Sequence, residues 1–273
     1  MTSGGIRVVH GAMKIPLYQV DAFTAKPFAG NPAAVCPLEE WLDDATMQAL
    51  AAENNLAETA FFVPEDAGFH LRWFTPTVEV DLCGHATLAT GWVIFNRFDW
   101  PLDSIDFRTR SGMLSVARDG ARLALDFPAR MPAPGGDLDA VAAALGARPR
   151  QLLASRDAMA VFATEDEVRA LKPDMAKVAA LDTFAVIATA PGGDGETDFV
   201  SRFFAPRAGV PEDPVTGSAH CTLVPYWAAR LDKPRLFARQ VSARGGELWC
   251  EDHGARVTIA GHCARVIEGT VTL

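Results

Sequence analysis

Three side chains able to hold or transfer a proton, Glu58, His85 and Asp213, stand near glycine-containing turns of the sequence. Glu58 lies in the mostly apolar segment Asn55–Phe61, where a carboxylate partly removed from water can act as a general base. His85 follows Gly84 at an expected helix start, where the positive end of the helix dipole favours a neutral imidazole that relays a proton. Asp213 precedes a second helix start, where it can cap the helix, orient an amine or carry a proton.

Each candidate also has a structural interpretation. A glutamate before a strand is usually solvated, and a histidine at a helix start is often only a hydrogen-bond donor. Asp213 precedes Pro214, a pattern typical of a turn or a cap. Cys83, just before Gly84, is either a reactive thiol or a small buried side chain.

An internal repeat favours the functional interpretation. Arg72–Pro76 and Arg202–Pro206 share the pattern Arg-aromatic-Phe-x-Pro. At nearly the same offset, Cys83–Ala86 and Thr216–Ala219 each place a glycine and a polar residue at the start of an apolar helical segment. We therefore predict a duplicated unit of about half the chain, each copy with one buried central helix.

The pattern of short strands, tight turns and few helices predicts an α+β fold. Pro and Gly density at Met131–Gly136 places the boundary between the halves there, which divides the chain into 1–130 and 131–273. Residues 1–12 lack periodicity and are expected to form a loose leader. In this division the last strand, 264–273, can cross over and pair with the first half.

If the two helix starts faced each other, Gly84-His85 and Gly217-Ser218 would form a binding site for an anion. The first turn of a helix leaves backbone N–H groups without partners and carries partial positive charge, and glycine lets a ligand approach the backbone. Such a site suits a carboxylate and the enolate-like charge that develops when a carbon is deprotonated.

A family resemblance rests on segments that occur in one order along the chain. They are Val20–Phe23, Pro27–Val35, Asn55–Phe61, Asp81–Thr87 and Glu212–His220. Together they resemble the phenazine-biosynthesis PhzF-like family, and the likeness runs from about Met13 to the C-terminus.

The resemblance implies a fold like that of diaminopimelate epimerase. In that fold two similar domains each wrap a mostly antiparallel sheet around a central helix, the active site lies between them, and the protein is expected to be a homodimer. It implies a cofactor-free isomerase that moves a proton between carbons of a small carboxylate-bearing substrate. The family's functional residues fall on Glu58, His85 and Asp213 as catalytic groups, and on Gly84, Gly217 and Ser218 around the substrate. Asn31 is expected to line the site as well.

Two alternatives stay open. One is an epimerase or racemase with two opposed bases, in which Cys83 or His85 faces Glu58. A two-thiol version is disfavoured because Asp213–Gly217 contains no cysteine. The other is a carboxylate-binding protein of the same fold without turnover.

Composition excludes several classes of partner. The net charge is −9 and no lysine or arginine run occurs, which argues against a nucleic-acid or anionic-membrane surface. No uninterrupted apolar stretch of about 18 residues suggests a membrane span. Five scattered cysteines without a CxxC pair predict a reduced, cytoplasmic protein, and no spacing predicts a metal or a dinucleotide cofactor.

Overall fold

The computed structural model describes residues 13–273, and the expected leader at 1–12 lies outside them. Helices are α1 (Asp44–Asn54), α2 (Gly84–Arg97), α3 (Leu138–Leu145), α4 (Glu165–Ala170), α5 (Met175–Ala180) and α6 (Gly217–Leu231), with a 3-10 turn at Pro206–Ala208. Strands up to the linker are β1 (Lys14–Ala22), β2 (Asn31–Pro37), β3 (Glu58–Glu65), β4 (Gly68–Phe74), β5 (Glu79–Val80), β6 (Ser104–Thr109), β7 (Gly112–Asp119), β8 (Arg122–Pro128) and β9 (Ala133–Pro134). The later strands are β10 (Gln151–Ala154), β11 (Ala158–Val161), β12 (Val186–Pro191), β13 (Phe199–Ala205), β14 (Val210–Asp213), β15 (Arg235–Gln240), β16 (Gly246–Asp252), β17 (Arg256–Gly261) and β18 (Cys263–Thr272).

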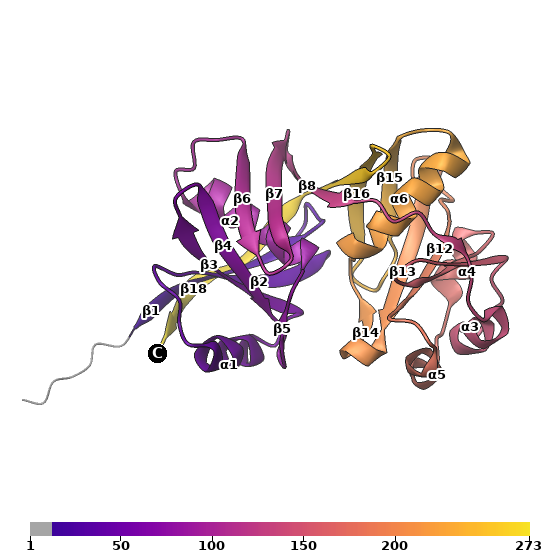
Figure 1. The fold of residues 1–273 in the computed structure, drawn as a ribbon, viewed down its shortest axis with the longest axis horizontal. Coiled ribbons are helices and arrows are strands. Elements are labelled where there is room, and N and C mark those ends of the chain that lie inside the picture. The colour runs from indigo at the N-terminus through magenta and orange to yellow at the C-terminus, as the bar shows by residue number, and fades with distance from the viewer. Residues whose placement is uncertain (1–12) are drawn as a thin grey trace, which may run out of the picture.

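The two halves repeat one order of strand pairings. In the first half β2 runs parallel to β3, and β3, β4 and β5 pair antiparallel before α2 begins. In the second half β11 runs parallel to β12, and β12, β13 and β14 pair antiparallel before α6 begins. The meanders β6–β7–β8 and β15–β16–β17 then follow the two helices. Figure 1 shows the resulting lobes side by side, which confirms the predicted α+β duplication.

Strands exchanged between the halves join the lobes. β18 pairs antiparallel with β1 from Lys14 opposite Thr272 to Ala22 opposite Cys263, so the end of the chain lies in the first lobe (Figure 1). β8 also pairs with β17, with Phe127 opposite Val257. Backbone hydrogen bonds thereby fix the position of each lobe relative to the other.

The repeated Arg-aromatic-Phe-x-Pro pattern fixes the turn before each central helix. Arg72 Nε donates to Glu79 Oε1 at 2.7 Å, and Arg202 Nε donates to Glu212 Oε1 at 2.7 Å. Each guanidinium also lies over the phenylalanine ring two residues further along its strand. A planar guanidinium that binds a carboxylate through two nitrogens holds a fixed geometry, and here it ties β4 to β5 and β13 to β14.

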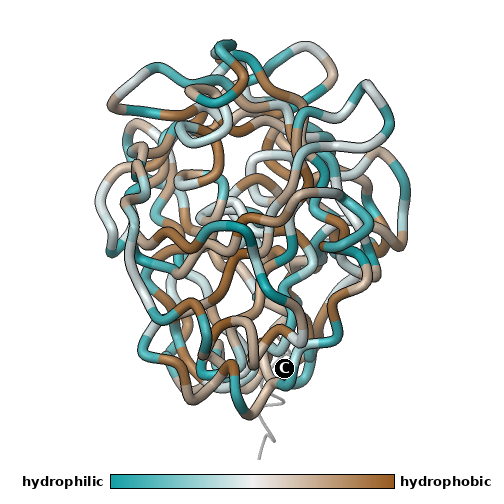
Figure 2. Tube along the Cα trace, turned by 90° about the vertical axis from the view of Figure 1, so that its right-hand side faces the viewer, coloured by the Kyte–Doolittle hydropathy of each residue, from teal (hydrophilic) through white to brown (hydrophobic). Residues whose placement is uncertain are grey.

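Both central helices are apolar on nearly every face because sheet surrounds them. The buried hydroxyl of Thr90 in α2 bonds to the helix itself, because Thr90 Oγ1 donates to the carbonyl of Ala86 at 2.7 Å. In α6 the fully buried Trp227 stacks on Phe199 with 5.8 Å between ring centroids. Figure 2 shows hydrophobic residues on segments that run through the interior and hydrophilic ones on peripheral loops. Among residues 13–273, no helix has both the length and the apolar character needed to cross a membrane.

Some elements differ from what the sequence pattern indicated, and β2 and α5 are examples. β2 begins at Asn31, inside the segment Pro27–Pro32 that its glycine and prolines made look like a turn throughout; the turn ends at Gly30, whose φ is +65°. The short helix α5 was not predicted, because only Val178 among its residues is buried and no apolar periodicity marks it.

A close approach between α2 and β7 generates the first prediction. A Cβ on Gly91 would lie 2.7 Å from Cγ1 of the buried Val116. We expect Gly91→Ala to lower the free energy of unfolding by about 1 kcal/mol, because overpacking outweighs the better helix propensity of alanine. Urea denaturation measures this change. Val116→Ala should lower the free energy of unfolding by less in the Gly91→Ala variant than in the native chain. A Gly91→Ala protein as stable as the native one would contradict the prediction.

Candidate functional site

The starts of α2 and α6 meet at the junction of the lobes. A Cβ placed on Gly84 would lie 3.9 Å from Gly217 Cα, and one placed on Gly217 would lie 4.0 Å from Gly84 Cα. The residues at the N-cap positions are Cys83 and Thr216, and neither side chain accepts a hydrogen bond from its helix. Two helix N-termini with uncapped first turns therefore share one space, which is the arrangement that binds an anion.

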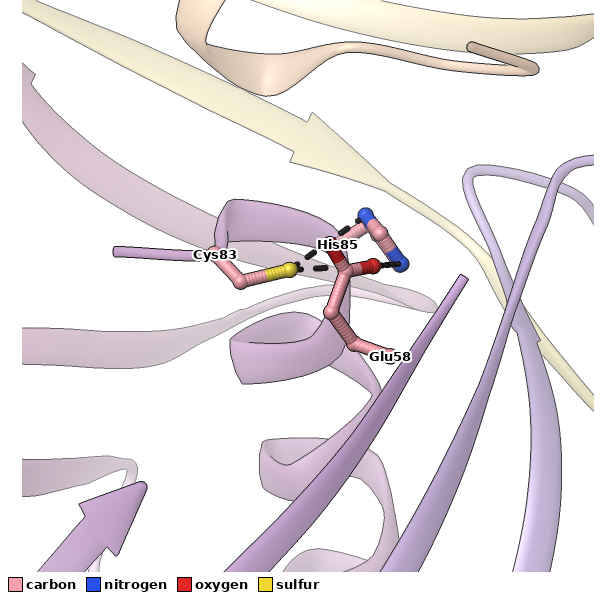
Figure 3. A group of neighbouring side chains, drawn as sticks. All are labelled: Glu58, Cys83 and His85. Atoms are coloured by element: carbon pink, nitrogen blue, oxygen red, sulfur yellow. Dashed lines mark hydrogen bonds and ion pairs between the residues drawn. The ribbon is translucent and has the colours of Figure 1, made fainter. Parts of the chain in front are cut away.

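Glu58, Cys83 and His85 form one cluster on the first-half side of this space (Figure 3). Glu58 is the first residue of β3, and its Oε2 lies 3.0 Å from His85 Nε2. This contact has the distance of an ion pair but not the geometry of a hydrogen bond. Glu58 Oε2 is buried, and among residues 13–273 it has no hydrogen-bond partner. Cys83 Sγ lies 3.5 Å from His85 Nδ1 on the other edge of the ring.

Asn31 reaches across the junction from the first residue of β2. Its Nδ2 donates to Asp213 Oδ1 at 2.8 Å and to the carbonyl of Val215 at 2.9 Å, and it lies 3.2 Å from His85 Nδ1. An amide nitrogen has only two hydrogens, and the second-half oxygens take both. His85 Nδ1 is thus left free to donate toward the Cys83 sulfur.

Arg244, which no sequence pattern indicated, holds the Asn31 turn in place together with Asp21. Arg244 Nη2 donates to Oδ1 of the buried Asp21 at 2.9 Å, and Arg244 Nε donates to the carbonyl of Gly30 at 2.8 Å. The other carboxylate oxygen of Asp21 accepts from the backbone of Phe28 at 2.7 Å. This set joins the first lobe to the turn after β15, far away in the sequence, so no local signal could have revealed it.

Gln240 has a similar role on the second side of the junction. Its buried side chain accepts from the Thr216 backbone N–H at 2.8 Å and donates to the Asp213 carbonyl at 2.7 Å. These bonds shape the turn that leads into α6. The Thr216 hydroxyl in turn donates to Asp213 Oδ2.

Six of the residues named from the sequence thus come together: Asn31, Glu58, Gly84, His85, Asp213 and Gly217. Ser218 occupies the first turn of α6 beside them, and its hydroxyl oxygen accepts a hydrogen bond from Arg156 at 3.3 Å. The structure places these residues; their roles in catalysis and binding stay predictions.

Neighbouring charges change the protonation expected for His85. Burial lowers the pKa of His85, but Cys83 and the Glu58 carboxylate beside the ring raise it by more, so the pKa lies well above its ordinary value. The neutral imidazole predicted from the helix dipole is therefore wrong, because that prediction left out the carboxylate at 3.0 Å. An imidazolium has N–H donors on both edges, which fits Glu58 on one edge and the Cys83 sulfur on the other.

Burial also shifts the other titratable groups of the site. Desolvation raises the pKa of Asp213 to about 6, although His85 and the Thr216 hydroxyl act in the opposite direction. Desolvation raises the pKa of Cys83 to about 11, so its sulfur is a neutral thiol near neutral pH.

The ligand atoms of Glu58, Cys83 and His85 lie within 4.8 Å of one another, and they are of types that zinc accepts. Cys83 is held as a thiol, and His85 is charged by its pairing with Glu58. A metal would have to displace the protons that Cys83 and His85 hold, whereas the cluster can hold and move a proton as it stands. A metal-free site stays the prediction.

Comparisons with known proteins agree along the length of the chain. A family model described as phenazine biosynthesis-like protein (PhzC-PhzF) matches residues 20–269. An uncharacterized isomerase of Pseudomonas aeruginosa is 53% identical over 262 residues, which cover 96% of this chain and 100% of the relative. The crystal structure of a PhzF-family phenazine biosynthesis protein of Enterococcus faecalis superposes with a TM-score of 0.93 at 46% identity, covering 96% of this chain and 100% of that one.

A more distant likeness concerns the fold alone. A hydroxyproline epimerase from Agrobacterium vitis superposes with a TM-score of 0.58 at 11% identity, over 95% of this chain and 93% of that one. The duplicated architecture is therefore shared with epimerases of small molecules.

The raised pKa of Asp213 predicts a pH-dependent stability. Asp213 has a pKa of about 6 in the folded protein, whereas an unfolded aspartate has a pKa of about 3.9. The folded state binds the extra proton between these values, so stability falls as pH rises through this window. Asp213→Asn removes that ionisation, and we expect the stability of the variant relative to the native protein to rise by on the order of 2 kcal/mol between about pH 4 and about pH 7.

Urea denaturation at the two pH values measures the change for Asp213→Asn. The control is Asp66→Asn, which alters an exposed carboxylate and should leave the relative stability nearly constant. A stability difference for Asp213→Asn that does not grow with pH would contradict the prediction.

Proposed function

The chain belongs to the phenazine biosynthesis-like (PhzC-PhzF) family and is an isomerase, and on this premise we propose that Glu58 transfers a proton between carbon atoms of a small carboxylate-bearing substrate. The resemblance inferred from the sequence is confirmed. Family membership sets aside the non-catalytic alternative, since curated relatives are named isomerases.

The single observation that carries the proposal is the meeting of two helix starts beside the Glu58 carboxylate. In this proposal the backbone N–H groups of Gly84 and Gly217, in the first turns of their helices, bind the substrate carboxylate. Removal of a proton from a carbon conjugated to that carboxylate moves negative charge onto its oxygens. The same N–H groups and helix dipoles then stabilise the charge where it develops.

Proton transfer begins when a carboxylate oxygen of Glu58 takes the proton from the substrate carbon. The C–H electron pair enters an enolate-like system over the bound carboxylate. Glu58 then returns the proton to a different carbon on the same face, so that a double bond moves and no electrons are gained or lost. His85 and Asp213 hydrogen-bond the substrate during both steps, and the hydrogen bond from Asn31 holds Asp213 in place across the junction.

The strand registers support chemistry with one base. Arg72 and Arg202 are equivalent in the repeat, and they pair with Phe61 and Ala188 on the neighbouring strands. Counting back along these strands, the position equivalent to Glu58 is Ala185, whose side chain cannot take a proton. The position equivalent to Cys83 is likewise Thr216, at the other N-cap. The second half therefore has no counterpart of the Glu58 base or of the Cys83 thiol.

We further propose that the protein acts on a small molecule without a metal or organic cofactor, as a homodimer in the cytoplasm. The contacts of His85 with Glu58 on one edge of the ring and with Cys83 on the other support metal-free proton transfer. The cysteines of residues 13–273 are all free, which supports a reducing compartment.

Substitution of the base tests the proposal directly. Small carboxylic acids with an activated C–H bond are incubated with the enzyme in deuterated buffer, and incorporation of deuterium is followed by NMR. For an accepted compound, we expect Glu58→Gln to slow exchange by roughly 10²-fold to 10⁴-fold, the usual contribution of a general base. Glu53→Gln, an exposed carboxylate on α1, is the matched control. Deuterium exchange at the native rate in Glu58→Gln would contradict the role proposed for Glu58.

The epimerase alternative makes a different prediction for Cys83. Cys83 lies on the same side of the junction as Glu58, with both contacting His85, and its pKa is raised to about 11 by burial. We expect Cys83→Ser to retain deuterium exchange within roughly threefold, far less than loss of a general base costs. Chiral chromatography of the product provides the second readout. Inversion of a stereocentre that Cys83→Ser abolishes would favour two opposed bases instead.

A further inference from the structure

The duplication indicates what the second half contributes to the wall opposite Glu58. The strand registers align Glu58 with Ala185, and Phe184 directly precedes Ala185. Arg156 lies in the turn between β10 and β11, and its guanidinium lies over the Phe184 ring. Where the first half has the Glu58 carboxylate, the second half thus has an aromatic ring and a guanidinium.

Arg156 is held rigidly. Its Nε donates to Asp157 Oδ1 at 3.0 Å and its Nη2 donates to Asp157 Oδ2 at 2.9 Å, while the guanidinium lies 4.8 Å from the centre of the Phe184 ring. The Asp157 side chain is fully buried, yet the Arg156 side chain remains 36% exposed. Burying a carboxylate is costly unless a cation pairs with it. Here the buried Asp157 carboxylate fixes one side of the Arg156 guanidinium, and the other side reaches the surface. A cation fixed in advance loses little entropy when it binds a ligand.

The hydrogen bond between Arg156 and Ser218 sets the direction of the serine proton. Arg156 Nη2 donates to Ser218 Oγ at 3.3 Å, so the Ser218 oxygen acts as an acceptor on that side. Its own O–H must then donate elsewhere, and Ser218 stands in the first turn of α6 next to Gly217. Among residues 13–273, Arg156 Nη1 has no hydrogen-bond partner. Two donors therefore remain for an anion beside the start of α6.

We propose that Arg156 is a substrate-binding residue, and that Arg156 Nη1 and the Ser218 hydroxyl together bind the substrate carboxylate from the wall opposite Glu58. This inference rests on the proposed function and adds the orientation of the substrate. The carboxylate lies toward the second half, and the carbon that loses its proton lies toward Glu58. The charge of Arg156 makes the site select a carboxylate over a neutral amide of the same shape.

Benzoate and benzamide test the proposal without any turnover, since neither carries an activated C–H bond. Both are titrated into the full chain, and the dissociation constants are read from the backbone amide signals of Gly84, Gly217 and Ser218 by NMR. We expect native protein to bind benzoate at least tenfold more tightly than benzamide. Because Arg156→Gln alone would leave the buried Asp157 charge unpaired, the test variant is Arg156→Gln with Asp157→Asn. It should weaken benzoate binding by about tenfold or more and leave benzamide binding unchanged.

The controls separate this inference from the proposed function. Arg148→Gln removes another cation of the same half, one paired with Asp139 at the surface, and should leave benzoate binding unchanged. Arg156→Lys keeps the charge without the planar geometry and should restore part of the affinity. Native protein that fails to prefer benzoate, or a folded double variant that binds it as tightly as native protein, would overturn the role of Arg156. The proton transfer by Glu58 is tested separately, by deuterium exchange in Glu58→Gln, and that test does not depend on the benzoate result.

Discussion

Two helix N-termini directed at one space repel each other, because each carries about half a positive charge. The fold holds them there by strand exchange, in which β18 pairs with β1 and β17 pairs with β8. The repulsion that remains is relieved by an anion placed between the helices. The strand exchange thus keeps an unfavourable electrostatic arrangement in the free protein. In the proposed function, a negatively charged substrate converts it into binding energy and, during proton transfer, into stabilisation of the developing charge.

The polar groups around this space form one connected network across the lobes. Asn31 links the His85 side of the junction to Asp213, and Gln240 fixes the turn that carries Asp213. Arg244 fixes the turn that carries Asn31. Buried polar networks of this kind specify one geometry, because each unpaired group would be costly. Two buried oxygens depart from this rule: among residues 13–273, Asn31 Oδ1 has no hydrogen-bond partner, and Glu58 Oε2 has only its ion-pair contact with His85.

Much of this arrangement was predictable from the sequence because the repeat marks it. The Arg-aromatic-Phe-x-Pro pattern and the glycine-bearing helix starts identify equivalent points of two units, and facing units bring Gly84 and Gly217 together. Local patterns could not predict the contacts of Arg244 with Gly30, of Gln240 with Asp213 and of Arg156 with Ser218, because each joins segments distant in the chain. The charge state of His85 was mispredicted for the same reason: the helix start is visible in the sequence, whereas the distance to Glu58 is set by the fold.

The pairing of β18 with β1 has a consequence for how the molecule is made. Among residues 13–273, β1 is the first strand to leave the ribosome and its partner β18 is the last. Until β18 has been synthesised, one edge of β1 lacks this strand and exposes backbone donors and acceptors that can pair with other chains. The first lobe therefore cannot complete its sheet before the second lobe has been made. A chain that lacked β18 would contain both lobes, but the first would be open at its edge.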